Sequence, residues 1–127
     1  MLLAIDVGNT NVNLGVFEGQ HLRCTWRVAT DQRKMADEYG LILSSILTLR
    51  NVRPEDITEA CLCSVAPTLT GTFEEVCENY FHVKPLTVSS GVKTGIRILY
   101  DNPRDVGSDR IVDAVAALHL YGGPVII

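Results

Sequence analysis

The residues best suited to chemistry near the N-terminus follow an apolar run that ends at Asp6. The stretch reads "AIDVGNTNVN", so an acid is followed at once by a glycine and by short amide and hydroxyl side chains. We expect Gly8 to let the backbone approach a ligand closely and to adopt a positive φ. The N–H groups from Gly8 to Asn11 can then converge on an anion, while Thr10 and Asn13 add neutral donors.

An acid beside an anion requires a cation between them. A Mg²⁺ ion that reaches Asp6 directly or through water would reverse the repulsion between the carboxylate and phosphate oxygens. Acid, glycine and neutral donors in this order therefore suit a metal–nucleotide. The alternative reading of the same stretch is an ordinary hairpin that "GN" closes and Asp6 caps.

A second group of chemical residues lies in "YDNPRDVGSDR", residues 100–110. We expect Ser108 to cap a helix there, with Asp109 and Arg110 in its first turn. Asp109 can accept the proton of a substrate hydroxyl that attacks a phosphoryl group. Arg110 can hold a carboxylate or stabilise transferring charge, and Tyr100 can donate a hydrogen bond. Taken alone, Asp109 is better explained as a favourable charge at a helix N-terminus.

The hydrophobic periodicity predicts the elements that must position these residues. Three strands joined by short turns come first, and helices then alternate with strands, which is typical of an α/β domain with a mixed sheet. The expected elements are strands at 2–7, 11–17 and 21–29, a helix from Asp37 to about 50, a strand within 57–66, a helix from Pro67 to about Tyr80, a strand at 84–89, a loop through 107, a helix at 108–121 and a strand at 124–127.

Composition narrows the class of partner. The net charge of −4 argues against nucleic acid or a membrane surface held by a basic field. No apolar stretch approaches the length of a membrane span, and Asp6 interrupts the first one, so we expect neither a membrane segment nor a secretory signal. Cys61 and Cys63 share one face of a strand without a histidine at zinc spacing, which favours reduced thiols in a cytoplasmic protein.

The two motifs together resemble those of one enzyme family. "IDVGNTNVNLGVF" followed by "YDNPRDVGSDRIVDAVAA" is similar to type III pantothenate kinases of coenzyme A synthesis. The resemblance implies the fold of the acetate and sugar kinase/Hsc70/actin superfamily, with two ribonuclease H-like domains around an active-site cleft. On this basis residues 1–106 would form the first domain, and 107–127 would lead into a second domain outside this chain.

The resemblance also assigns roles to residues. Tyr100 would contact pantothenate, as would Gly107, Ser108, Asp109 and Arg110, which match the family's Gly-Ala-Asp-Arg segment with Asp109 as proton acceptor. Ser108 replaces the usual alanine, a change that we interpret as small. The residues matching the ATP phosphate-binding turn are Asp6, which would be associated with Mg²⁺, and Val7, Gly8, Asn9, Thr10, Asn11, Val12 and Asn13.

The expected function is therefore phosphorylation of pantothenate by ATP with Mg²⁺. The resemblance further implies a K⁺ or NH₄⁺ requirement, with the cation's ligand beyond Ile127, and a homodimer. Two alternatives stay open. One is a non-catalytic, nucleotide-binding regulatory relative of the same fold. The other is a kinase of the same superfamily that acts on another small alcohol or carboxylate.

Overall fold

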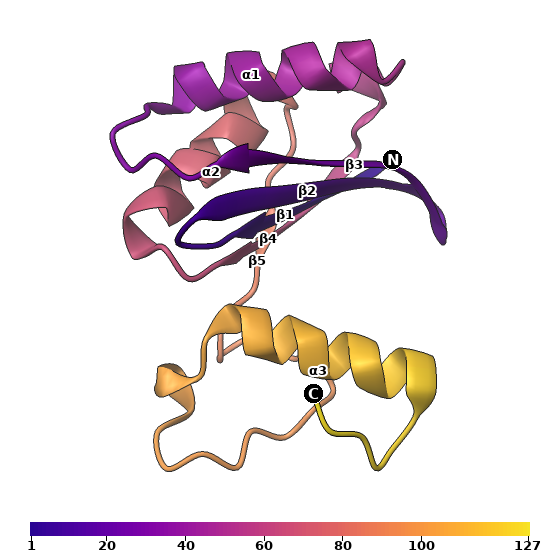
Figure 1. The fold of residues 1–127 in the computed structure, drawn as a ribbon, viewed down its shortest axis with the longest axis vertical. Coiled ribbons are helices and arrows are strands. Elements are labelled where there is room, and N and C mark those ends of the chain that lie inside the picture. The colour runs from indigo at the N-terminus through magenta and orange to yellow at the C-terminus, as the bar shows by residue number, and fades with distance from the viewer.

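Figure 1 shows the computed structural model of the chain, which describes residues 1–127. The strands and helices follow the order expected from the sequence, apart from the C-terminal strand. The elements are β1 (Leu2–Val7), β2 (Asn11–Glu18), β3 (His21–Ala29), α1 (Ala36–Leu49), η1 (Pro54–Asp56), β4 (Glu59–Ser64), α2 (Pro67–Tyr80), β5 (Leu86–Thr87), η2 (Pro103–Asp105) and α3 (Ser108–Tyr121).

The five strands form one mixed sheet in the order β3-β2-β1-β4-β5. The first three strands pair antiparallel through tight connections, whereas β1 runs parallel to β4 and β4 runs parallel to β5. Parallel neighbours need a crossover, and α1 and α2 provide the two crossovers here. The α/β class and the mixed sheet predicted from the sequence are confirmed.

Helices α1 and α2 lie together over one face of the sheet (Figure 1). Alternate residues of β1 point to this face, and Leu3, Ile5 and Val7 are almost completely buried there. The rings of Tyr39 on α1 and Phe73 on α2 meet with centroids 4.7 Å apart and lie at the centre of the core. This layer is the main hydrophobic core of the chain.

The opposite face of the sheet is largely open. Helix α3 lies on this side, after a long connection that follows β5, and it approaches the sheet mainly at the end of β4 (Figure 1). Three apolar side chains of α3 lie at helical spacing: Ile111, Val115 and Leu118. Ile111 is buried, but Leu118 is 46% exposed, so only the first turns of α3 pack against the body of the chain.

Two expectations about strands need correction. The segment 124–127 forms no strand, because it has no neighbouring strand to pair with, and Ile126 is fully exposed. The strand expected at 84–89 is reduced to β5, which covers only Leu86–Thr87. Helix α3 ends as expected at Gly122, whose φ of +73° suits glycine.

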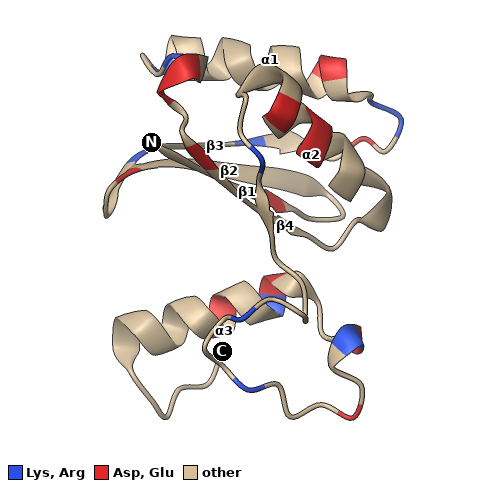
Figure 2. Ribbon diagram, turned by 180° about the vertical axis from the view of Figure 1, so that it is seen from behind, with Lys and Arg blue, Asp and Glu red and all other residues tan.

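Charged residues lie mainly on the helices and the connecting loops, and few lie on the strands (Figure 2). No helix of the chain combines the length and the apolar character that a membrane span needs. All four cysteines carry free thiols, and no group of three or more His, Cys, Asp or Glu side chains could hold a metal ion.

Candidate active site

The turn between β1 and β2 is held by hydrogen bonds on both sides. The Gly8 N–H donates to the Asn11 carbonyl at 3.0 Å and closes the hairpin. Thr30, just after β3, holds the outside of the turn: its hydroxyl donates to the Gly8 carbonyl at 2.8 Å and its N–H donates to the Thr10 carbonyl at 2.9 Å. The turn is therefore fixed by the sheet before any ligand arrives.

Gly8 is needed because the Asn11 carbonyl oxygen lies close to it, and not because of a positive φ. Its φ lies in the ordinary negative range, so the expectation of a positive φ is wrong. A Cβ at this position would lie 2.9 Å from the Asn11 carbonyl oxygen, which is closer than real side chains allow. Because the Gly8 N–H is used within the hairpin, the free backbone donors of the turn include the exposed N–H groups of Asn9 and Thr10, which have no acceptor in the protein.

Two of the residues assigned to the turn contribute only through their backbone. Val7 and Val12 are directly paired between β1 and β2, and both side chains are completely buried beneath the helices. The alternation of a strand places their neighbours on the other face, where Asp6 and Asn13 form the next pair. The side chains available to a ligand are thus those of the open face and of the turn itself.

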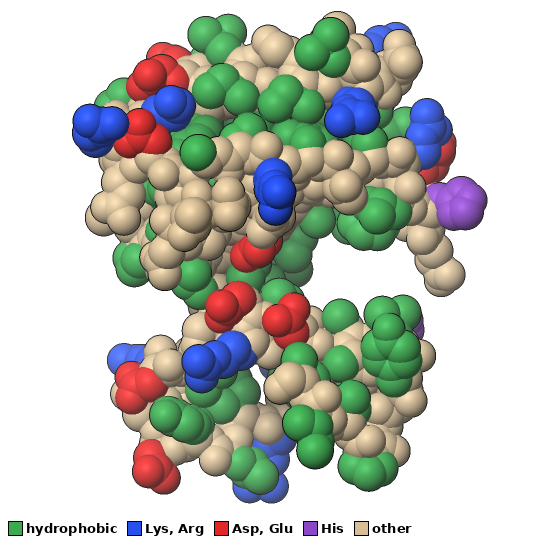
Figure 3. Space-filling view, in the orientation of Figure 1, with side chains coloured by type: hydrophobic (Ala, Val, Ile, Leu, Met, Phe, Trp, Pro, Cys, Tyr) green, Lys and Arg blue, Asp and Glu red, His purple; other side chains and the backbone are tan.

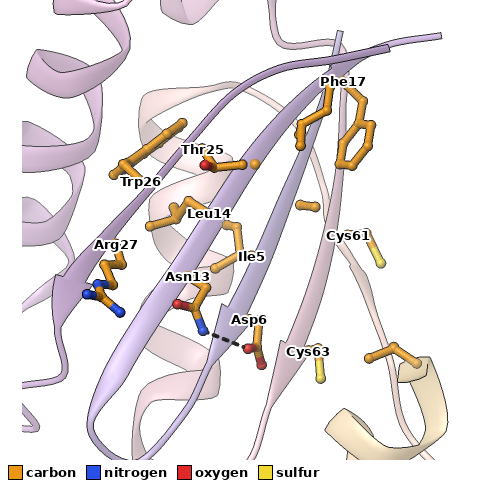
Figure 4. Close-up of a pocket in the computed structure, with 14 residues that line it drawn as sticks. Ile5, Asp6, Asn13, Leu14, Phe17, Thr25, Trp26, Arg27, Cys61 and Cys63 are labelled. Atoms are coloured by element: carbon orange, nitrogen blue, oxygen red, sulfur yellow. Dashed lines mark hydrogen bonds between the residues drawn. The ribbon is translucent and has the colours of Figure 1, made fainter. Parts of the chain in front are cut away.

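Asp6 lies on the open face at the edge of a hollow of about 620 Å³ (Figure 4). Its Oδ2 atom accepts a hydrogen bond from Asn13 Nδ2 at 3.1 Å, and its Oδ1 atom has no partner in the protein. Arg27 on β3 pairs in register with Asn13 and also lines the hollow. The rest of the lining is mostly apolar, so the polar groups are concentrated at the end of the sheet next to the turn.

These residues fit a magnesium ion that reaches the protein with a nucleotide. Mg²⁺ is commonly bound by one or two carboxylates together with substrate phosphates and water, and not by a closed protein cage. A single accessible carboxylate with one free oxygen, Asp6, beside the amide of Asn13 matches that ligand set. The absence of a cluster of three ligands does not conflict with it.

Cys63 lies between the two motifs of the sequence, the turn after Asp6 and the start of α3 at Ser108. It lies opposite Asp6 in the parallel β1–β4 register, and its Sγ atom is 3.3 Å from the hydroxyl oxygen of Ser108 at the start of α3. Burial raises the pKa of the Cys63 thiol to about 11; the hydrogen bond with Ser108 acts in the opposite direction, and the carboxylates of Asp6 and Asp109 raise the pKa further. Asp6 and the first turn of α3, which carries Asp109, therefore both adjoin Cys63.

Acidic side chains gather where the first turn of α3 meets the body of the chain (Figure 3). Asp109 is half-buried there, and its Oδ1 atom accepts a hydrogen bond from the Arg110 N–H at 2.8 Å. The same oxygen lies against Gly107, where any Cβ would collide with it. A side chain at position 107 would therefore displace the Asp109 carboxylate from this position.

The expectation that Ser108 caps α3 is wrong. The N-cap residue is Gly107, which offers no side chain, and Ser108 is the first residue of the helix. Its side chain turns away from the helix end and bonds to β4 instead. Two further residues expected at the acceptor side are not tied to the site: Tyr100 is 59% exposed on the connecting loop, and the exposed Arg110 side chain forms no ion pair.

Sequence reasoning gave no role in the site to three residues near these segments. Thr30 and Cys63 carry no motif, and only the close contacts of the folded chain show that they hold the turn and the start of α3. Arg104 lines a second, more polar hollow of about 310 Å³ beside Gly107 and Ser108. It falls within the quoted loop, but nothing in the pattern distinguishes it from other surface arginines.

Comparison with known proteins gives two results. A family model described as type III pantothenate kinase matches residues 2–127. A curated protein from Agathobacter rectalis, named type III pantothenate kinase, is 46% identical over 127 residues, which are 100% of this chain and 49% of that relative. The chain therefore spans about half the length of the curated relative that it matches.

Proposed function

This chain belongs to the type III pantothenate kinase family, and from that premise we propose that it supplies one wall of the active site of an ATP-dependent pantothenate kinase. The reaction would transfer the γ-phosphoryl group of ATP to the primary hydroxyl of pantothenate, giving 4′-phosphopantothenate and ADP. The 127 residues would provide the phosphate-binding turn and the proton acceptor.

The observation that carries this proposal is the meeting of the two motifs at Cys63. Asp6 and Asp109 are 103 positions apart in the sequence, yet Cys63 pairs in register with Asp6 and its Sγ atom lies 3.3 Å from the hydroxyl oxygen of Ser108, the neighbour of Asp109. A phosphoryl-transfer site needs a nucleotide-binding wall and an acceptor wall that face each other, because positioning and electrostatics supply most of the catalysis. The hairpin-turn alternative accounts for the first motif alone and gives no reason for the second to lie beside it.

On the nucleotide side, the N–H groups of Asn9 and Thr10 would donate to phosphate oxygens. Mg²⁺ bound with the nucleotide would neutralise phosphate charge, and the free oxygen of Asp6 is the atom available to it or to its water. Thr30 would keep the turn from collapsing, since it occupies the carbonyls of Gly8 and Thr10 from outside.

On the acceptor side, Asp109 would take the proton of the attacking hydroxyl. Its carboxylate lies at the N-terminus of α3, where negative charge is favoured, and one of its oxygens is already oriented by the Arg110 N–H. Arg110 and Tyr100 would contact the substrate. Both side chains are available for this, because neither has a partner in the chain. Gly107 and Ser108 would hold the start of the helix.

The finer expectations rest on the family resemblance alone and remain part of this proposal. They are the K⁺ or NH₄⁺ requirement, the homodimer, the cytoplasmic location, and the division into a first domain at 1–106 and a lead-in to a second at 107–127. The relative's greater length is consistent with a second domain.

The test is an assay of pantothenate-dependent ADP release by the protein produced at the full length of its gene. Asp109→Asn should lower kcat at least about 100-fold, because it removes the proton acceptor and keeps the shape. Asp113→Asn is the matched control, since Asp113 lies exposed one turn further along the same helix. Full activity of Asp109→Asn would remove Asp109 as the base.

The same assay separates the two alternatives. A folded wild-type protein that binds ATP but releases no ADP with any acceptor would indicate a regulatory relative. ADP release with another small alcohol or carboxylate, and none with pantothenate, would indicate a kinase of different specificity.

A further inference from the structure

The C-terminal end of strand β4 has no neighbouring strand on its β5 side. The backbone hydrogen bonds of successive β4 residues point alternately to β1 and to β5. The Val65 N–H, just beyond the strand, donates to the Val7 carbonyl on the β1 side. The Leu62 carbonyl accepts from the Val88 N–H on the β5 side at 2.8 Å. Ser64 is the next residue that faces the β5 side. Because β5 is only two residues long, no strand backbone reaches Ser64.

The Ser108 hydroxyl occupies the place of that missing strand. It donates to the Ser64 carbonyl at 2.8 Å and accepts from the Ser64 N–H at 3.1 Å, so one oxygen satisfies both backbone groups of the residue. It also lies 3.3 Å from Cys63 Sγ, which can donate to it. A hydroxyl has one donor and two acceptor sites, and all three are used here.

This arrangement is buried and lies between the two proposed functional carboxylates. Ser108 is 8% exposed and is the one buried polar residue of the chain. The next residue is Asp109, while Cys63 pairs in register with Asp6. A hydrogen bond at Ser108 therefore ties the helix turn that carries one carboxylate to the strand that adjoins the other.

We infer that Ser108 is a positioning residue, whose hydroxyl fixes the first turn of α3 to the end of β4 and so sets the placement of Asp109 relative to Asp6. This inference rests on the proposed function for its catalytic consequence, although the contact itself does not. The alanine of the family's Gly-Ala-Asp-Arg segment cannot make these bonds. The inference therefore gives the Ser108 hydroxyl a role that our interpretation of the serine as a small change did not include.

The contact is tested first without any activity. In this chain, Ser108→Ala should speed hydrogen exchange of the Ser64 amide about tenfold, because that N–H loses its acceptor and the local opening becomes easier. The Val65 amide, which bonds to β1, should be unaffected and serves as the internal reference. Ser45→Ala is the matched control, since the Ser45 hydroxyl bonds within α1 at Leu41, far along the chain from β4.

The catalytic consequence is tested in the full-length enzyme. Ser108→Ala should lower kcat about fivefold and leave the KM for ATP unchanged, because a loosened helix turn misplaces Asp109 but not the nucleotide turn. Ser108→Thr, which keeps the hydroxyl, should restore both kcat and the slow exchange of Ser64.

The outcomes separate the two claims. An unchanged Ser64 exchange rate in Ser108→Ala overturns the contact, whatever the wild type catalyses. Faster exchange with unchanged kcat, or a rise in the KM for ATP alone, overturns the positioning role. If Ser108→Ala speeds the exchange of Ser64 but the full-length wild type has no kinase activity, the contact is established and the proposed function is defeated instead.

Discussion

The two faces of the sheet are built from the same strands but differ in what lies against them. Helices α1 and α2 cover one face, and the other face is largely open (Figure 1). On the face beneath α1 and α2, alternate residues of β1 and β2 are aliphatic and fully buried, as Val7 and Val12 are. On the open face, their immediate neighbours Asp6 and Asn13 are polar and bonded to each other. Because successive side chains of a strand point to opposite faces, a buried core residue and an accessible polar residue are direct neighbours in the sequence.

This difference explains why the open face tolerates an incomplete cover. The covered face contains the large buried side chains, including Tyr39 and Phe73, and accounts for most of the buried apolar area. The open face holds the hollow of about 620 Å³, with Asp6 and Arg27 at its polar end. A substitution should therefore affect either the free energy of unfolding or the activity, according to the face on which it lies.

The largest expected effect is on the covered face. Phe73→Ala should lower the free energy of unfolding by about 3–5 kcal/mol, because it leaves a large cavity against the Tyr39 ring. Phe17→Ala, on the half-buried lining of the open face, should cost about 1 kcal/mol, since little is packed over it. Urea unfolding of both variants measures the difference. Equal losses would show that the two faces contribute alike to stability.

The next largest effect should appear on the open face and in activity alone. Asp6→Asn should lower kcat/KM of the full-length enzyme about 100-fold, as loss of one preorganised electrostatic contact does. Its unfolding free energy should stay within about 0.5 kcal/mol of the wild type, because the side chain is accessible and an amide oxygen can still accept from Asn13. A large loss of stability would assign Asp6 to the hairpin instead.

Local patterns were enough to predict much of this arrangement. Alternation along β1 and β2, the turn at Gly8 and the helix from Pro67 to Tyr80 each depend on residues close in sequence, and the structure confirms them. The same-face pairing of Cys61 and Cys63 also followed from strand geometry, and both line the hollow. These predictions succeed because the backbone alone determines the side-chain direction.

The features that the sequence did not predict depend on distant contacts. Ser108 resembles a helix cap in its local pattern, yet its hydroxyl bonds 44 positions away at Ser64. Thr30 holds the Gly8 carbonyl across 22 positions. The strand expected at 124–127 failed for the complementary reason, since an apolar run forms a strand only beside a partner.

A third effect concerns the one thiol deep in the covered layer. Burial raises the pKa of Cys77 to about 12, and the neighbouring acids Glu74 and Glu78 act in the same direction. The unfolded thiol ionises at its ordinary pKa near 9 while the folded thiol stays neutral, so this contribution to stability is complete below pH 9 and is lost as the pH rises towards 12. At pH 10 the loss should be about 1.4 kcal/mol.

The measurement compares the free energy of unfolding of the wild type and Cys77→Ala at pH 8 and pH 10. Other groups that titrate in this range are common to both proteins, so the difference between the two pH dependences isolates Cys77. The variant should lose about 1.4 kcal/mol less than the wild type over this interval. Parallel curves would mean that Cys77 ionises alike in the folded and unfolded states.

The smallest effect should come from the contact between Thr30, just after β3, and the turn between β1 and β2. Thr30→Val removes the hydroxyl that donates to the Gly8 carbonyl but keeps the backbone bond to Thr10. We expect a loss of about 1 kcal/mol in stability and a rise of about fivefold in the KM for ATP, because the turn is less well ordered before the nucleotide binds. Thr25→Val is the matched control, since Thr25 lies exposed on β3, the strand that leads into Thr30, and its hydroxyl bonds to nothing. If both variants raise the KM equally, the effect belongs to β3 as a whole and the turn is not held by Thr30.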